Sequence, residues 1–109
     1  MEVPVSPFEF HLEGVRLSEA VRTRIHKRYE KWTHGHTDLT GGAIAVGPTQ
    51  SAATPHEFRA RIVLYHRPEN IAAIAKASHP ADAVTAALDA TERQLREARE
   101  VLREKWKRG

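Results

Sequence analysis

The chain has 109 residues, 40% hydrophobic and 28% charged, which is typical of one globular domain and too apolar for a disordered segment. It contains no cysteine, which excludes a disulfide framework, a thiolate metal site and a cysteine nucleophile. No apolar stretch reaches the length of a membrane span and the first residues lack the layout of a signal peptide, so we expect a cytoplasmic protein without a membrane partner.

The net charge of +3 conceals an uneven distribution of charge along the chain. Residues 16–36 contain six basic and two acidic side chains, and residues 92–108 contain seven basic and four acidic ones. These two segments together carry +7, so the rest of the chain sums to −4. Such a clustered basic footprint is typical of a domain that binds phosphate backbones, although an anionic membrane or an acidic protein would also attract it.

Alternating and then helical periodicity defines the first two elements. Apolar residues at positions 8, 10 and 12 alternate with polar ones, which predicts a strand with one buried face. Ser18 is a suitable N-cap for the helix that follows, and we expect that helix to stop near residues 34–36. Its apolar positions are Leu17, Val21, Ile25, Tyr29 and Trp32. Its basic positions on one flank of that face are Arg24, Lys27, Arg28 and Lys31.

Three strands are expected in the middle of the chain. Ile44 and Val46 predict a short strand between Gly41-Gly42 and Gly47-Pro48, and residues 58–65 alternate clearly. Arg59 and Arg61 should project from the face opposite Ile62, where we expect solvated side chains. Residues 71–77 predict a fourth strand, although alanine favours helix, because so short a segment between turn signals suits a strand better.

A long amphipathic helix is predicted from Pro80 toward Trp106. Its apolar positions step by four and three: Val84, Leu88, Thr91, Leu95, Ala98 and Leu102. Its basic flank comprises Arg96, Arg99, Arg103 and Lys107, while the acidic side chains Asp89, Glu97, Glu100 and Glu104 should lie farther round. The predicted order is β-α-β-β-β-α, an α+β fold in a single domain over residues 1–109, in which a common core fixes both basic rows.

Two segments of this chain resemble the ribosome hibernation-promoting factors and ribosome-associated translation inhibitors. The first is residues 17–32, where Arg22, Arg28 and Lys31 fall on basic positions of the family pattern. The second is residues 83–99, whose most specific part is Glu92-Arg93-Gln94-Leu95-Arg96 and which also matches at Arg99. The remaining candidates, Arg24, Lys27, Arg103 and Lys107, depend on helical geometry alone.

The resemblance implies a binding protein without enzymatic activity or cofactor. Both helices would pack on one face of a four-stranded sheet and present their basic rows to the RNA of the small ribosomal subunit. Binding in the cleft between head and body would overlap the mRNA and tRNA sites, block translation and protect idle ribosomes. The C-terminal extension by which long members dimerise has no counterpart, so the resemblance implies a short form, which we expect to be monomeric off the ribosome.

Other interpretations remain open from the sequence. The basic flanks could be solvated helix faces with i,i+4 pairs such as Glu92 with Arg96. The order of elements partly resembles a double-stranded RNA-binding module, and the last helix could be a protein-docking seam. His26, His34 and His36 lack a specific ligand spacing, and no catalytic motif is present, so we expect no metal and no small-molecule substrate.

Overall fold

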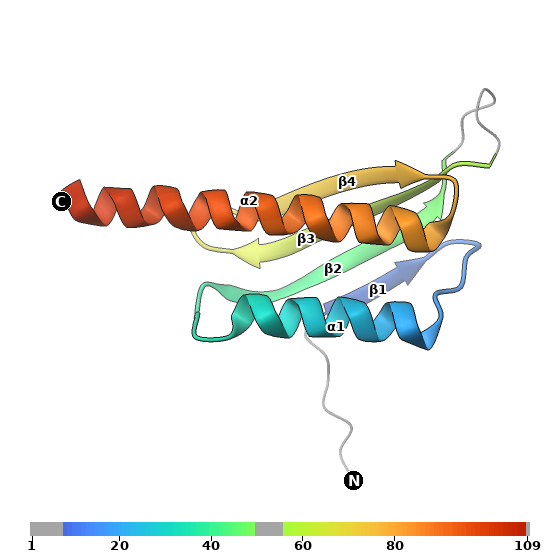
Figure 1. Cartoon of the computed structure of the whole chain (residues 1–109), viewed down its shortest axis with the longest axis horizontal. Helices are drawn as coiled ribbons and strands as arrows, with labels where there is room; N and C mark the ends of the chain where they lie inside the picture. The colour runs from blue at the N-terminus through green and yellow to red at the C-terminus, as the bar shows by residue number, and fades with distance from the viewer. Residues whose placement is uncertain (1–7, 50–55, 109) are drawn as a thin grey trace, which may run out of the picture.

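A computed structural model describes residues 8–49 and 56–108 and confirms the predicted order of elements. The strands are β1 (Phe8–Leu12), β2 (Leu39–Pro48), β3 (Phe58–His66) and β4 (Ile71–Ala77), and the helices are α1 (Glu19–Thr33) and α2 (Pro80–Arg108). Figure 1 shows α1 beside β1 and β2, and α2 along β3 and β4. Among the described residues, no helix is both long and apolar enough to span a membrane.

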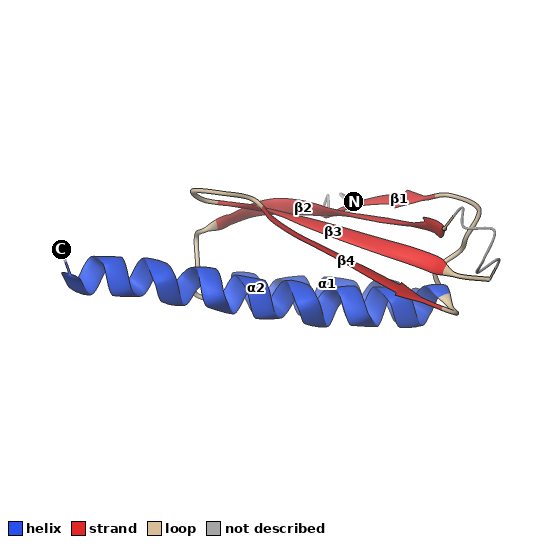
Figure 2. Cartoon of the chain, turned by 90° about the horizontal axis from the view of Figure 1, so that it is seen from above, coloured by secondary structure: helices blue, strands red, loops and turns tan. Residues whose placement is uncertain are grey.

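The four strands form one mixed sheet in the order β1-β2-β3-β4. β1 pairs parallel with β2, which requires a crossover, and α1 provides it. β2, β3 and β4 pair antiparallel through short or moderate connections. Both helices lie on the same face of the sheet, as predicted, and leave the opposite face uncovered (Figure 2).

The core lies between the sheet and the two helices. The predicted apolar positions of α1 are buried at Val21, Ile25, Tyr29 and Trp32. From the sheet, Ile44, Ile62 and Leu64 are fully buried, and from α2 the fully buried side chains include Val84, Leu88, Thr91 and Leu95. Thr91 is accommodated there because its hydroxyl donates to the carbonyl of Ala87 at 2.7 Å.

Capping fixes both ends of α1 near the predicted positions. The Ser18 hydroxyl accepts a hydrogen bond from the backbone amide of Val21 at 3.2 Å, which satisfies one of the amides left free at a helix N-terminus. Glu19 in the first turn and Lys31 in the last turn suit the helix dipole. Gly35 takes a φ of 73°, so the chain leaves the helix at the glycine where the sequence predicted a stop.

β2 is longer than predicted at both ends, because Gly41 and Gly42 as well as Gly47 and Pro48 belong to the strand and not to turns. The register shifts between Leu39 and Gly42, and Gly41 takes a φ of 147° at this irregularity. A Cβ atom on Gly42 would lie 2.8 Å from the Val63 carbonyl oxygen and 2.9 Å from a ring carbon of Phe8. Gly42 therefore permits close packing of three strands, and the strand extends through it.

Candidate nucleic-acid interface

The two helices run in the same direction, and side chains link them at regular intervals along their length. The Arg24 guanidinium donates to the Thr85 hydroxyl at 3.0 Å, and that of Arg28 donates to the Asp89 carboxylate at 3.1 Å. One turn farther, the indole nitrogen of Trp32 donates to Glu92 at 3.0 Å. The contacts advance by one turn on both helices, so the basic flank of α1 faces α2 directly.

Glu92 is the centre of the contacts between the helices. Besides the Trp32 hydrogen bond, its carboxylate lies 3.6 Å from the amino group of Lys31, the guanidinium of Arg28 and the guanidinium of Arg96. The hydrogen bond from Trp32, followed by the charges of Lys31 and Arg28, holds the pKa of Glu92 below its usual range. The predicted i,i+4 pair of Glu92 with Arg96 therefore exists, but as one part of a larger cluster.

Arg99 is half-buried rather than exposed like Arg96 and Arg103 of its predicted flank. Its guanidinium makes two hydrogen bonds to the Asp38 carboxylate, at 2.8 and 2.9 Å, and a third to the Trp32 carbonyl at 2.6 Å. Only 18% of its side chain is exposed. The hydrogen bonds from Arg99 lower the pKa of Asp38, outweighing the opposite effect of burial. Arg99 thus ties α2 to the end of α1 and to the residue before β2.

The buried His66 completes this junction from the sheet side. Its Nε2 lies 3.2 Å from the Asp38 carboxylate, although not aligned for a hydrogen bond, and its Nδ1 lies 3.1 Å from the Glu69 carbonyl. Arg99 and His66 therefore both lie close to the Oδ2 atom of the Asp38 carboxylate. Asp38 and His66 carry no sequence signal for this role, because only the fold brings the loop before β2 beside the end of β3.

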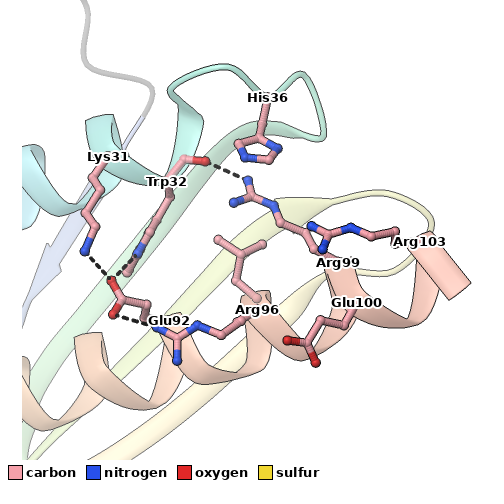
Figure 3. A pocket seen from close by; sticks show the side chains of 9 residues that line it. Lys31, Trp32, His36, Glu92, Arg96, Arg99, Glu100 and Arg103 are labelled. Carbon is pink, nitrogen blue, oxygen red and sulfur yellow. Dashed lines mark hydrogen bonds and ion pairs between the residues drawn. The ribbon is translucent and has the colours of Figure 1, made fainter.

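A groove of about 270 Å³ opens between the last turn of α1 and the middle of α2 (Figure 3). Its floor includes Trp32 and Leu95, and its polar and charged walls are formed by Lys31, His36, Glu92, Arg96, Arg99, Glu100 and Arg103. The side chains of Lys31 and Arg96 are 71% and 68% exposed, on opposite sides of Glu92. The groove combines accessible cations with an apolar floor, an arrangement suited to an anionic partner that carries flat apolar groups.

A second depression adjoins this groove at Lys31. It has a volume of about 360 Å³ and is lined by Ala20, Thr23, Arg24, Lys27, Arg28 and Lys31. All four basic residues predicted from the helical flank of α1 therefore border one hollow. We name the groove and this depression together the helix-face surface.

The predicted basic residues fall into two groups by environment. The exposed group consists of Arg24, Lys27, Lys31, Arg93, Arg96 and Arg103. The half-buried group consists of Arg22, Arg28 and Arg99. Arg22 lies 5.0 Å above the Phe10 ring and donates to the Leu17 carbonyl at 3.4 Å. The side chain of Lys107 lies outside the described residues.

The histidines are dispersed in the structure. His26 packs at 5.6 Å from the Phe10 ring, whereas His36 borders the groove and was not predicted as part of the binding surface. Within residues 8–49 and 56–108, no three His, Asp or Glu side chains converge in a way that could hold a metal ion. His36 could have been found only from its position after the helix, at the end of the basic flank.

Comparisons with known proteins agree with this fold. The model of the family described as sigma 54 modulation protein / S30EA ribosomal protein matches residues 8–103. A ribosomal subunit interface protein from Coxiella burnetii superposes with a TM-score of 0.62 at 16% identity, covering 85% of this chain and 97% of that one. The Protein Y N-terminal domain from Thermus thermophilus gives 0.59 at 13% identity, covering 82% and 93%. No curated protein sequence matches.

Proposed function

The chain belongs to the sigma 54 modulation protein / S30EA ribosomal protein family, and we propose that it binds the RNA of the small ribosomal subunit through the helix-face surface. The observation that carries this proposal is the exposure of Lys31 and Arg96 on opposite sides of the groove between α1 and α2. Bound there, the domain would occlude the mRNA and tRNA sites, and so inhibit translation or protect idle ribosomes.

The environments of the basic residues support two different roles, one in contacting RNA and one in positioning the helices. The exposed group can reach phosphates, and arginine is well suited to this because its guanidinium binds a phosphate through two parallel hydrogen bonds. Arg28 and Arg99 hold the two helices at a fixed offset through the Asp89 carboxylate and the Trp32 carbonyl, respectively. In this proposal the half-buried group positions the surface, and the exposed group contacts the RNA.

Steric occlusion requires no chemical step, so the function depends on affinity and shape. Phosphate contacts would displace condensed cations from the RNA, which makes binding depend steeply on salt concentration. The rigid sheet behind the helices would keep the basic side chains in place during association, which limits the entropy lost on binding.

The experiment is co-sedimentation with purified small ribosomal subunits over a series of salt concentrations. Neutralising two exposed cations, in Lys31→Gln/Arg96→Gln, should weaken binding and lower the magnitude of the salt slope by about 1.4 to 1.8, given ~0.7 to 0.9 per phosphate contact. Both positions are exposed, so the fold should change little in stability.

A matched control removes the same charge elsewhere. Arg67→Gln/Lys105→Gln changes two exposed residues near the β3–β4 turn, on the side of α2 that borders His66 and Pro68. This variant should sediment like the wild type. Absence of wild-type binding at low salt, or equal losses in both double variants, would contradict the proposal.

A double-stranded RNA-binding module is the competing function, and the same assay separates the two. Free RNA duplex should compete poorly with subunits if the groove fits a ribosomal site. Competition by duplex at equal concentration would favour the general RNA-binding module instead.

A further inference from the structure

The uncovered face of the sheet carries its own group of basic side chains. Because side chains alternate along a strand, the residues that point away from the helices on β3 are Arg59, Arg61, Val63 and Tyr65. Arg59, Arg61 and Tyr65 are exposed, and so is Lys76 on β4. Figure 2 shows that no helix approaches this face.

Strand register brings three of these cations together at one end of the sheet. Arg59 is paired directly with Lys76 across β3 and β4, and Arg61 is paired with Ile74. Directly opposed side chains on one face have their Cβ atoms roughly 5 Å apart, and neighbours along the strand on the same face lie about 7 Å apart. Two guanidinium groups and one ammonium group therefore share a small area.

Like charges directly opposite each other destabilise a sheet, so a bound anion would offset the repulsion between Arg59 and Lys76. Within the described part of the chain, Arg59, Arg61 and Lys76 form no ion pair. The carboxylate of Glu9 lies 3.4 Å from His11, and Glu13 borders the same hollow as Arg59 and Arg61. At this hollow the two guanidinium groups outnumber the Glu13 carboxylate, so the cluster keeps an excess of positive charge.

A hollow of about 520 Å³ lies beside these arginines. It is bordered by β1, by the small residues Ala45 and Gly47 of β2, and by Arg59 and Arg61. Ala45 is the register partner of Arg61, so the surface beside that guanidinium is low. Gly47 is the partner of Arg59, and there the Glu13 side chain lies close, with its carboxylate oxygen 3.6 Å from the position of a Cβ on Gly47. A ligand resting on β2 at Ala45 can be contacted by both arginines from one side.

We infer that this face, which we call the sheet-face surface, is a second RNA-binding site, formed by Arg59, Arg61, Lys76 and Tyr65. The three cations bind phosphates, and the Tyr65 ring, 37% exposed on the same face four residues along β3 from Arg61, stacks on a base. At about 3.3 Å per residue Tyr65 lies about 13 Å from Arg61, a distance that an extended RNA strand spans. An exposed aromatic on the face of a basic cluster favours single-stranded RNA over an acidic peptide, which has no flat groups to stack. The domain then binds RNA on both of its faces.

The inference extends the proposed function, and a bridging assay tests it independently. A biotinylated single-stranded RNA oligonucleotide is immobilised, the full chain is added, and a second, fluorescent oligonucleotide is then supplied. Wild-type protein should capture the fluorescent RNA, because each face holds one strand. Arg59→Gln/Arg61→Gln should bind the immobilised RNA but capture roughly tenfold less of the second strand, since about two phosphate contacts are lost.

Variants of the helix-face surface separate this inference from the proposed function. The Lys31→Gln/Arg96→Gln variant should still bind RNA through the sheet-face surface. Adding Arg59→Gln and Arg61→Gln to this variant should lower the magnitude of its salt slope by about 1.4, since each phosphate contact with a single strand contributes ~0.7. If Lys31→Gln/Arg96→Gln alone abolishes all RNA binding, the sheet-face surface is not a site, while the proposed function stands. If only this surface binds RNA and subunits do not sediment with the protein, the proposed function fails and the inference stands.

Two further measurements identify the ligand class. Tyr65→Ala should weaken binding of the RNA oligonucleotide and leave binding of polyglutamate unchanged. The inference would be overturned in favour of an acidic protein partner by two results together. Polyglutamate would displace the second RNA strand at equal charge concentration, and Tyr65→Ala would not change RNA binding. The matched control for Arg59→Gln/Arg61→Gln is Arg67→Gln/Lys105→Gln. The inference would also be overturned if Arg59→Gln/Arg61→Gln captured as much of the second RNA strand as the wild-type protein.

Discussion

Arg99 and Arg103 lie one helical turn apart on α2 but have opposite environments. Arg99 is held by three hydrogen bonds to Asp38 and to the Trp32 carbonyl, whereas Arg103 is exposed at the rim of the groove. Helical spacing predicted that both arginines lie on the same basic flank of α2. It could not predict which of them meets an acidic partner, because Asp38 comes from a loop 61 residues away.

Replacing Arg99 should destabilise the fold much more than replacing Arg103. Arg99→Met removes all three hydrogen bonds that Arg99 donates to the Asp38 carboxylate and the Trp32 carbonyl, which should lower the free energy of unfolding by about 2 to 4 kcal/mol. Arg103→Met, at an exposed position, should change it by less than about 0.5 kcal/mol. Urea denaturation monitored by circular dichroism measures both, and equal values would show that the Asp38 contacts add nothing to stability.

Stability should fall in acid because two carboxyl groups have lowered pKa values in the folded state. Hydrogen bonding from Arg99 lowers the pKa of Asp38 from 3.8, and hydrogen bonding from Trp32 lowers that of Glu92 from 4.5. The unfolded chain therefore takes up protons first as the pH falls. The stabilisation that the two carboxylates provide is complete at pH values above the ordinary pKa values of these groups. It is lost as the pH falls through the ordinary values toward the lower pKa values of the folded state.

Denaturation at a series of pH values between neutral and strongly acid measures this loss. Asp38→Asn and Glu92→Gln should each flatten the dependence of unfolding free energy on pH. Glu104→Gln, at an exposed position outside both networks, should keep the wild-type slope. A wild-type slope in Asp38→Asn would mean that the Arg99 contact does not persist in solution.

At the scale of elements, periodicity predicted the strands and helices well wherever one face is buried. β4 was found at Ile71–Ala77 as predicted, despite its alanines, since Ile71 and Ala73 are buried while Ala72 and Ile74 are exposed. β2 was predicted too short, because two adjacent glycines are typical of a turn. Only the packing of Gly42 against Val63 and Phe8 explains a glycine within the strand.

Gly42→Ala should therefore disrupt the centre of the sheet. The new Cβ atom would meet the Val63 carbonyl oxygen at 2.8 Å, and backbone in a paired strand yields little. We expect a loss of about 2 to 3 kcal/mol in unfolding free energy. Gly47→Ala is the matched control, because its closest neighbour is the Glu13 Cβ at 3.2 Å, beyond the end of β1. Similar melting temperatures for the two variants would argue against the close packing of β1, β2 and β3.

The sequence predicted most of the basic residues of the candidate surface, but not how they are arranged in space. The four cations on the flank of α1 do border one depression, as the helical spacing predicted. Glu92 and His36 were not expected within the surface, because the sequence does not show how far apart the two helices lie or where the loop after α1 runs. Those distances depend on the sheet beneath both helices.

At the scale of the molecule, the helices share one core with the sheet, so we expect a single cooperative unfolding transition. In a Trp106→Phe variant the buried Trp32 is the only tryptophan and reports on the end of α1. Its fluorescence and the far-ultraviolet circular dichroism of both helices should change with the same midpoint. A fluorescence change that precedes the loss of helix signal would show that α1 separates from the sheet before α2.

The position of Glu92 among Arg28, Lys31 and Arg96 also affects how strongly the helices can hold a partner. An incoming phosphate competes there with the Glu92 carboxylate, which already lies 3.6 Å from each of these side chains. One carboxylate offsets only one of the three positive charges, so the side chains keep a net positive charge for the phosphate, and part of the association is an ion exchange. A protein built in this way can release a large polyanion readily, since its own carboxylate is ready to contact these cations again as the phosphate leaves.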